Sequence, residues 1–273
     1  MQKVVVVGCG WLGQQLATAL ASAGFDVFGS RQSAAGLAEL PAGIQPLLLQ
    51  LPLTLPDASV TEIFKDSWLI CLIPPAGRQQ STAQYLTQLQ NLLDIAISAG
   101  VRGLIHCSST GVYQGLSGDV DELSVEQSSV PENSRAWSLL AAEQILQQFP
   151  NCITLRLAGL IGPGRNPAWF GQGRTLTGAA LPVNLVHALD ISRFVLTLLT
   201  APLPVSPRLY NLCCPDHPQK IDFYHAAALQ AGLPAVTFVA SDEPARRVLS
   251  VRSEQLAGFC YQFKSPFQAL TSC

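Results

Sequence analysis

Three glycines near the start of the chain have the spacing of a phosphate-binding turn. Gly8, Gly10 and Gly13 follow an apolar run at residues 4–7, and a stretch rich in alanine and leucine comes after them. In such a strand–turn–helix unit the glycines permit a tight turn, let a pyrophosphate approach the backbone and let the helix pack on the strand. The phosphates then lie at the amino end of the helix. The pattern predicts a dinucleotide site; a glycine-rich turn that binds nothing is the alternative.

The residues after the second apolar run indicate which dinucleotide binds. An NAD site usually has Asp or Glu at this place, where the carboxylate accepts hydrogen bonds from the adenosine ribose. Here Ser30 and Arg31 end the run, whereas Asp26 stands at its start. A hydroxyl beside a guanidinium suits the 2′-phosphate of NADP, because a guanidinium forms charge-assisted, bidentate hydrogen bonds with phosphate. We expect NADP to be preferred and NAD to be the alternative; a solvated surface arginine is the competing interpretation.

Alternating strand-like and helix-like segments must hold these residues in place. Apolar runs at residues 67–73, 103–107 and 152–157 alternate with helix-like stretches at 81–99 and 134–149. Near-continuous apolar strands that alternate with helices are typical of a parallel sheet covered on both faces. We therefore predict an α/β fold with a Rossmann-type, doubly wound parallel sheet and a smaller C-terminal substrate lobe.

The carboxyl ends of the strands should form the ligand pocket, because ligands of such sheets bind there, where the strand order reverses. The glycine turn, the end of the second strand, the segment after residue 72 and the segment at 108–113 should therefore meet in one pocket. The predicted cofactor-binding residues are Gly8, Gly10, Trp11, Leu12, Gly13, Ser30, Arg31, Ile73, Pro74, Pro75 and Ser108.

A turn-rich segment at 162–167 suggests a domain boundary. We expect residues 1–160 to form the dinucleotide-binding domain and residues 161–273 to form the smaller lobe, partly interleaved with the sheet through an apolar run at 209–212.

The composition limits the class of partner. Of 273 residues, 48% are hydrophobic and only 12% are charged, and the net charge is −2. This balance offers no basic field for nucleic acid and no polybasic patch for a membrane surface, and it leaves room for a homo-oligomeric face. Residues 4–25 lack charge, but their glycines argue against a signal or a membrane span. We expect a cytoplasmic protein with a small-molecule substrate.

Cysteine and histidine spacing predicts no metal site. The eight cysteines include no Cys-x-x-Cys pair, and the four histidines are scattered along the chain. Several cysteines lie in apolar runs, where a thiol behaves as a small hydrophobic group.

Several further motifs occur in the order typical of one family. They are Ser-Ser-Thr-Gly-Val-Tyr at 108–113, Leu-Arg-Leu-Ala-Gly-Leu-Ile-Gly-Pro-Gly-Arg at 155–165, Asn-Leu-Val-His-Ala-Leu-Asp at 184–190, Tyr-Asn-Leu at 210–212 and Arg-Arg-Val at 246–248. With the glycine turn, they resemble the extended short-chain dehydrogenase/reductases, the NAD-dependent epimerase/dehydratase group. The resemblance implies that Ser109 hydrogen-bonds the reacting substrate oxygen. Tyr113, expected at the pocket mouth, is the second catalytic candidate. A turn-capping Ser109 and a packing Tyr113 are the alternatives.

The chain departs from that family at its catalytic pair. No tyrosine is followed four residues later by a lysine, and by comparison with the family Arg135 and Leu139 stand in these two places. Neither side chain can replace a phenolate whose pKa a lysine depresses, because arginine stays protonated and leucine has no proton to give. Arg135 could instead hold an anionic substrate group.

Two functions therefore stay open. The first is an NAD(P)-dependent oxidoreductase or epimerase, NADP-preferring, that acts on a small or nucleotide-linked polar substrate without the usual pair. The second is a non-catalytic NADP(H)-binding redox sensor or regulatory binding module.

Overall fold

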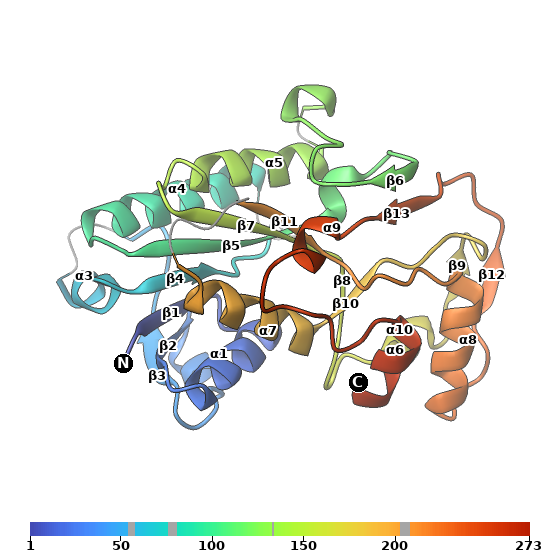
Figure 1. Cartoon of the computed structure of the whole chain (residues 1–273), viewed down its shortest axis with the longest axis horizontal. Helices are drawn as coiled ribbons and strands as arrows, with labels where there is room; N and C mark the ends of the chain where they lie inside the picture. Colours follow the sequence, from blue (N-terminus) through green and yellow to red (C-terminus); the bar gives the residue numbers. More distant parts are fainter. Residues whose placement is uncertain (54–57, 76–80, 133, 203–207) are drawn as a thin grey trace.

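A computed structural model describes residues 1–53, 58–75, 81–132, 134–202 and 208–273. Within these residues the centre is a sheet of seven parallel strands in the order β11-β7-β5-β4-β1-β2-β3 (Figure 1). The strands are β1 (Lys3–Val7), β2 (Asp26–Arg31), β3 (Gln45–Leu48), β4 (Trp68–Cys71), β5 (Gly103–Ser109), β7 (Cys152–Leu157) and β11 (Leu209–Leu212). The strand order reverses beside β1, which lies between β2 and β4. The predicted doubly wound Rossmann-type sheet is confirmed.

Helices cover both faces of the sheet, as Figure 1 shows. They are α1 (Trp11–Ser22) and α7 (Ala188–Thr200) on one face, and α3 (Ala58–Phe64), α4 (Thr82–Ser98) and α5 (Arg135–Leu146) on the other. Alternate valines of β1 explain this packing, because successive side chains of a strand point to opposite faces. Val4 and Val6 belong to the hydrophobic cluster under α1 and α7, and Val5 and Val7 to the cluster under the other three helices.

The long helices begin where the sequence supplies a cap. The Ser81 hydroxyl accepts the backbone N–H of Gln84, and the Gln84 side chain accepts the backbone N–H of Ser81, at the start of α4. At the start of α5 the Ser134 hydroxyl accepts the backbone N–H of Trp137. A side-chain acceptor satisfies amide groups that have no partner inside the helix. The predicted helices at 81–99 and 134–149 agree with α4 and α5 within a few residues.

A smaller lobe stands beyond the carboxyl ends of the strands (Figure 1). Its short strands pair as β8 (Gly159–Ile161) with β10 (Leu185–His187), β9 (Thr175–Thr177) with β12 (Thr237–Val239), and β6 (Gly118–Val120) with β13 (Arg246–Val248). Its short helices are α6 (Pro167–Gly171), α8 (Lys220–Gln230), α9 (Val251–Glu254) and α10 (Pro266–Ala269). The division at residue 160 stays a prediction; after it, α7 and β11 return to the central sheet.

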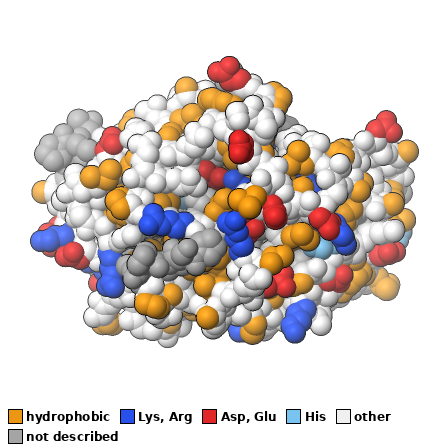
Figure 2. Space-filling view, turned by 45° about the horizontal axis from the view of Figure 1, so that its top comes forward, with side chains coloured by type: hydrophobic (Ala, Val, Ile, Leu, Met, Phe, Trp, Pro, Cys, Tyr) orange, Lys and Arg blue, Asp and Glu red, His pale blue; other side chains and the backbone are white. Residues whose placement is uncertain are grey.

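The surface carries little charge. On the face shown in Figure 2, acidic and basic side chains are interspersed among neutral and apolar ones. Among the described helices, none is long and apolar enough to cross a membrane. A search of the same residues finds no group of three or more His, Cys, Asp or Glu side chains placed to hold a metal ion.

Candidate functional site

The glycine turn after β1 has the close contacts that its motif requires. Gly8 has a φ of +88°, and a Cβ there would lie 2.9 Å from the carbonyl oxygen of Leu72. A Cβ on Gly13 would lie 2.9 Å from the carbonyl oxygen of Gly8. A larger residue at Gly13 would therefore push the start of α1 away from the turn, and at Gly8 it would also need a backbone conformation that side chains disfavour.

Two cavities meet at this turn. The first, of about 530 Å³, lies between β2 and β4 and is lined by six predicted residues: Gly8, Gly10, Ser30, Arg31, Ile73 and Pro74. The second, also about 530 Å³, shares Gly8, Gly10, Ile73 and Pro74 with the first and adds Trp11, Leu12, Gly13, Pro75, Ser108 and Ser109. The structure thus places every predicted cofactor-binding residue along one continuous groove.

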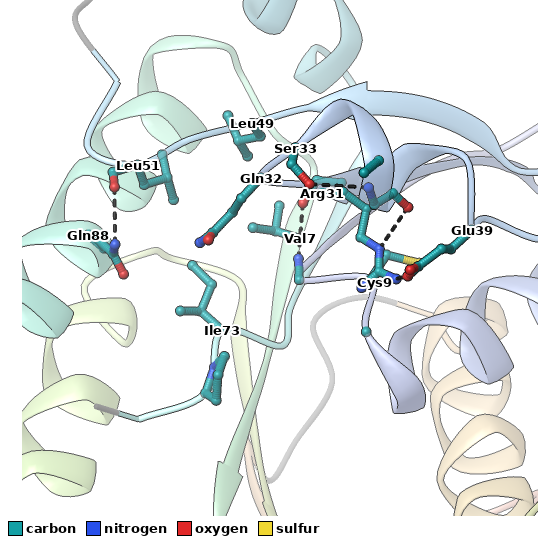
Figure 3. A pocket seen from close by; sticks show the side chains of 16 residues that line it. Val7, Cys9, Arg31, Gln32, Ser33, Glu39, Leu49, Leu51, Ile73 and Gln88 are labelled. Atoms are coloured by element: carbon teal, nitrogen blue, oxygen red, sulfur yellow. Dashed lines mark hydrogen bonds and ion pairs between the residues drawn. The ribbon is translucent and has the colours of Figure 1, made fainter. Parts of the chain in front are cut away.

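The first cavity contains a carboxylate that the sequence analysis missed. The Arg31 guanidinium pairs with the carboxylate of Glu39, and its Nε donates to the carbonyl oxygen of Gly36 at 3.1 Å (Figure 3). Ile73 and Gln88 lie across the cavity from this pair in Figure 3. Glu39 comes from the turn after the short helix α2 (Ala34–Leu37), where no sequence motif marks it.

Ser30 and Arg31 both line the first cavity, but they have different partners. The Ser30 hydroxyl accepts the backbone N–H of Gly8 at 3.0 Å, and the residue is only 3% exposed. Ser30 therefore holds the glycine turn against β2, and Arg31 is the more exposed of the two residues.

Ser109 lies at the wall of the second cavity and also caps a turn. Its Oγ accepts the backbone N–H of Gly111 at 3.0 Å, at the start of the 3₁₀ helix η1 (Thr110–Tyr113). This hydrogen bond is the one that the turn-capping alternative for Ser109 predicts. A hydroxyl that accepts one hydrogen bond keeps its own proton to donate, so the same group can also bind a ligand oxygen.

Tyr113 requires a correction, because it is not at the pocket mouth. It is fully buried; its hydroxyl donates to Asn211 Oδ1 at 2.8 Å and accepts from Arg156 Nη1 at 2.9 Å. Burial raises the pKa of Tyr113 to about 12, although Arg156 lowers it. The side chain follows the packing alternative: it fills the core under η1 and does not reach the groove.

A buried ion pair supports the floor of the groove. The Ser108 hydroxyl donates to Glu143 Oε1 at 2.6 Å, and Glu143 Oε2 accepts from Arg156 Nη2 at 2.8 Å. Glu143 and Arg156 are each 3% exposed. Ser108 therefore lines the groove from the carboxyl end of β5, which is tied through Glu143 of α5 to Arg156 of β7.

The start of α1 is joined to the smaller lobe through Trp11. The indole Nε1 donates to the carbonyl oxygen of Pro163 at 2.8 Å, and the Arg165 guanidinium lies over the indole ring, 5.3 Å from its centroid. A cation over an aromatic face is favourable by itself. Arg165 thus lines the second cavity beside the glycine turn.

A third cavity, of about 650 Å³, continues the groove into the smaller lobe. It shares Thr110 and Gly159 with the second cavity, and its charged lining residues are Lys220, Glu243 and Arg246. Burial lowers the pKa of Arg246, whose Nη1 donates to the carbonyl oxygen of Tyr113. This space has the position of a substrate pocket beside a dinucleotide groove.

The fold and the groove define a dinucleotide-binding α/β protein. The model of the NAD dependent epimerase/dehydratase family matches residues 4–213, and the chain belongs to this family. Protein YeeZ of Escherichia coli (strain K12) is 34% identical over 273 residues, in a match that covers 97% of this chain and 98% of YeeZ. The resemblance drawn from the sequence is confirmed, and the family's NAD dependence agrees with the predicted class of cofactor.

Solved structures share the fold over nearly the whole chain. A functionally unknown conserved protein from Silicibacter pomeroyi DSS has a TM-score of 0.80 at 23% identity, with 99% of this chain and 97% of that chain covered. The UDP-glucuronic acid 4-epimerase from Bacillus cereus, in complex with UDP-glucuronic acid and NAD, has a TM-score of 0.80 at 18% identity and the same coverage. At such identities the likeness concerns the fold.

Proposed function

We propose that this protein binds NADP(H) in preference to NAD(H) and uses it in an oxidoreductase or epimerase reaction on a small or nucleotide-linked polar substrate. The continuous groove carries the proposal. It runs from Arg31 past the glycine turn to Ser109, and opens there into the cavity of the smaller lobe. The epimerase from Bacillus cereus, which has the same fold, holds a nucleotide sugar and NAD.

Arg31 supports the preference for NADP. Its Nη1 lies 4.0 Å from the position that a Cβ on Gly10 would take, so the guanidinium borders the turn that would hold the pyrophosphate. A 2′-phosphate can accept two hydrogen bonds from such a group. Glu39 competes for the same guanidinium, so a bound 2′-phosphate would share or displace this carboxylate.

The nicotinamide supplies hydride transfer in such a reaction, and the chain supplies orientation. Ser109 hydrogen-bonds a substrate oxygen at the junction of the second and third cavities. The groove excludes the Tyr113 hydroxyl, so no tyrosine of the 108–113 segment moves a proton there.

One observation favours the non-catalytic alternative. At the two positions where the family has its Tyr/Lys pair, α5 presents Arg135 and the buried Leu139. Neither a guanidinium nor an alkyl side chain can take over the proton transfer of a phenolate. A redox sensor would keep the cofactor groove and lose turnover.

A nicotinamide titration tests the proposal. The purified protein is titrated with NADPH and with NADH, and binding is followed by nicotinamide fluorescence. Binding of NADP⁺ is measured by its competition with NADPH. We expect tight NADPH binding, weaker NADH binding, and a loss of about tenfold in NADPH affinity in Arg31→Gln, from the lost charge-assisted hydrogen bonds. Equal affinities would remove the NADP preference, and binding of neither dinucleotide would contradict the proposal as a whole.

A substrate screen separates the two candidate functions. Nucleotide-linked and free sugars, hydroxy acids and keto acids are offered with NADP⁺ or NADPH, and absorbance at the reduced-nicotinamide band is followed. Turnover that disappears in Ser109→Ala at unchanged NADPH affinity supports the enzyme. A surface conformation that differs between the NADPH-bound and the NADP⁺-bound protein, without any turnover, supports the sensor.

A further inference from the structure

The groove beside Ser109 has a strongly one-sided charge. Of the described residues that line the second cavity, two are arginines, Arg135 and Arg165, and none is an aspartate or a glutamate. The adjoining third cavity adds Lys220 and Arg246 against the single carboxylate of Glu243. A concave site lined by one sign of charge concentrates ligands of the opposite sign.

The two arginines of the second cavity have different surroundings. Arg165 lies over the Trp11 ring, next to the glycine turn where the phosphates of a dinucleotide would bind. Arg135 is exposed, and no carboxylate or carbonyl of the described residues pairs with its guanidinium. Arg135 is therefore the guanidinium of this cavity that is available to a second ligand.

Arg135 lies close to the hydroxyl of the proposed site. A Cβ placed on Gly111 would be 3.7 Å from Arg135 Nε and 3.3 Å from Ser109 Oγ. The two groups thus flank the same point above η1. Arg135 is the first residue of α5, whose cap and buried face fix the direction from which the side chain enters the groove.

We propose that Arg135 binds an anionic group of the substrate, a carboxylate or a phosphate, beside Ser109. This inference rests on the proposed function, because the substrate binds next to the cofactor. A guanidinium keeps its proton at neutral pH and presents a planar fork of donors that matches both kinds of anion. Arg135 is thus a substrate-binding residue that selects negatively charged substrates and takes no part in proton transfer.

The experiment measures anion binding to the cofactor-loaded protein. The protein is saturated with NADPH, so that the phosphate-binding turn is occupied, and is titrated calorimetrically at constant ionic strength. The probes are inorganic phosphate, gluconate as a carboxylate, and sorbitol as the neutral counterpart of gluconate. The variants are Arg135→Gln, Arg135→Lys and, as a matched control, Arg102→Gln, which removes an exposed guanidinium from the amino end of β5.

We expect at least one anion to bind to the wild type and sorbitol not to bind. Arg135→Gln should weaken anion binding about tenfold, Arg135→Lys should weaken it less, and Arg102→Gln should leave it unchanged. NADPH affinity should stay the same in all three variants, which also shows that they fold. Preference for phosphate or for gluconate identifies the anion.

Equal anion affinity in the wild type and Arg135→Gln would overturn the inference, and so would binding of neither anion. Failure of the proposed function has a different signature, which is loss of NADPH binding in the wild type. In that case the same titration of the free protein still decides the role of Arg135, because only the difference between the wild type and Arg135→Gln counts.

Discussion

At the residue scale, the adenosine end of the groove contains a cation that is already paired. Glu39 is two-thirds exposed and Arg31 is about one-fifth exposed, so water weakens their attraction and a stronger anion can replace the carboxylate. A 2′-phosphate carries more charge than a carboxylate and accepts the same bidentate bonds. If the proposed function holds, the Arg31–Glu39 pair sets how strongly the cavity distinguishes the two dinucleotides.

Glu39→Gln should raise NADPH affinity by about threefold to tenfold, because it removes a competing carboxylate near the 2′-phosphate. NADH affinity should change little. Fluorescence titrations with both dinucleotides at two salt concentrations measure the effect. A selective loss of NADH affinity would instead assign Glu39 to the ribose hydroxyls and the groove to NAD.

A second residue-scale pair lies under the carboxyl end of β5. Glu143 accepts hydrogen bonds from Ser108 and from Arg156, and both charged side chains are buried. Glu143→Gln would leave the Arg156 charge buried without its partner, which should cost about 3–5 kcal/mol of unfolding free energy. Urea unfolding followed by circular dichroism measures this change.

Asp119→Asn is the control for that variant, because Asp119 forms an exposed pair with Arg247. Its stability should stay close to that of the wild type. If both substitutions destabilise the protein equally, burial does not govern the cost, and the Glu143–Arg156 pair does not hold the end of β5 that carries Ser108.

At the element scale, the start of α1 and the loop after β8 meet through Trp11. Trp11→Phe keeps a ring under Arg165 but removes the hydrogen bond to Pro163. We expect an unfolding free energy lower by about 1 kcal/mol and NADPH affinity lower by a few-fold, because the loop is less firmly held over the groove. Urea unfolding and the NADPH titration provide both numbers.

Trp169→Phe provides the comparison, since this tryptophan is exposed on α6 and does not line the groove. It should change neither quantity. Equal effects of the two substitutions would mean that the contact between Trp11 and Pro163 does not couple α1 to the smaller lobe.

The elements were predictable from the sequence where local pattern determines them. Local interactions within a few residues form the valine run of β1, the glycine turn and the caps at Ser81 and Ser134. The order of the family's motifs along the chain then indicates the arrangement of the whole sheet. Tyr113 and Glu39 were not predictable in this way. Their positions depend on contacts with Asn211 and Arg31, which only the folded chain brings within hydrogen-bonding distance.

At the scale of the whole molecule, buried histidines couple stability to pH. Burial lowers the pKa of His106 to about 4, although Glu143 raises it, and burial also lowers the pKa of His187 and His217. The unfolded chain then binds protons at a higher pH than the folded chain does. Stability is therefore fully present above the unfolded pKa of about 6.5 and is lost as the pH falls towards the folded value.

Two buried carboxylates act in the opposite direction. Burial raises the pKa of Glu122 and Asp190, so the folded chain takes up these protons first and gains stability on acidification. Their contribution is present below the unfolded pKa of a carboxyl group, about 4, and is lost as the pH rises through the raised folded pKa values. Removing a histidine therefore isolates its share of the loss of stability below pH 6.5, because both carboxylates stay in the variant.

His106 should contribute most of this loss, because it is fully buried in β5 and neither ring nitrogen has a hydrogen-bond partner within the described chain. A pKa lowered from 6.5 to about 4 corresponds to about 3 kcal/mol between those two pH values. His106→Asn and His106→Leu should therefore both flatten the dependence of unfolding free energy on pH. This holds whether or not the substitutions change the unfolding free energy at pH 7.5. Urea titrations at half-unit intervals from pH 7.5 to 4.5 measure the slope. If both variants keep the wild-type slope, the buried imidazole of β5 is not the group that links folding to protons, and the titration of His187 and His217 must carry the effect.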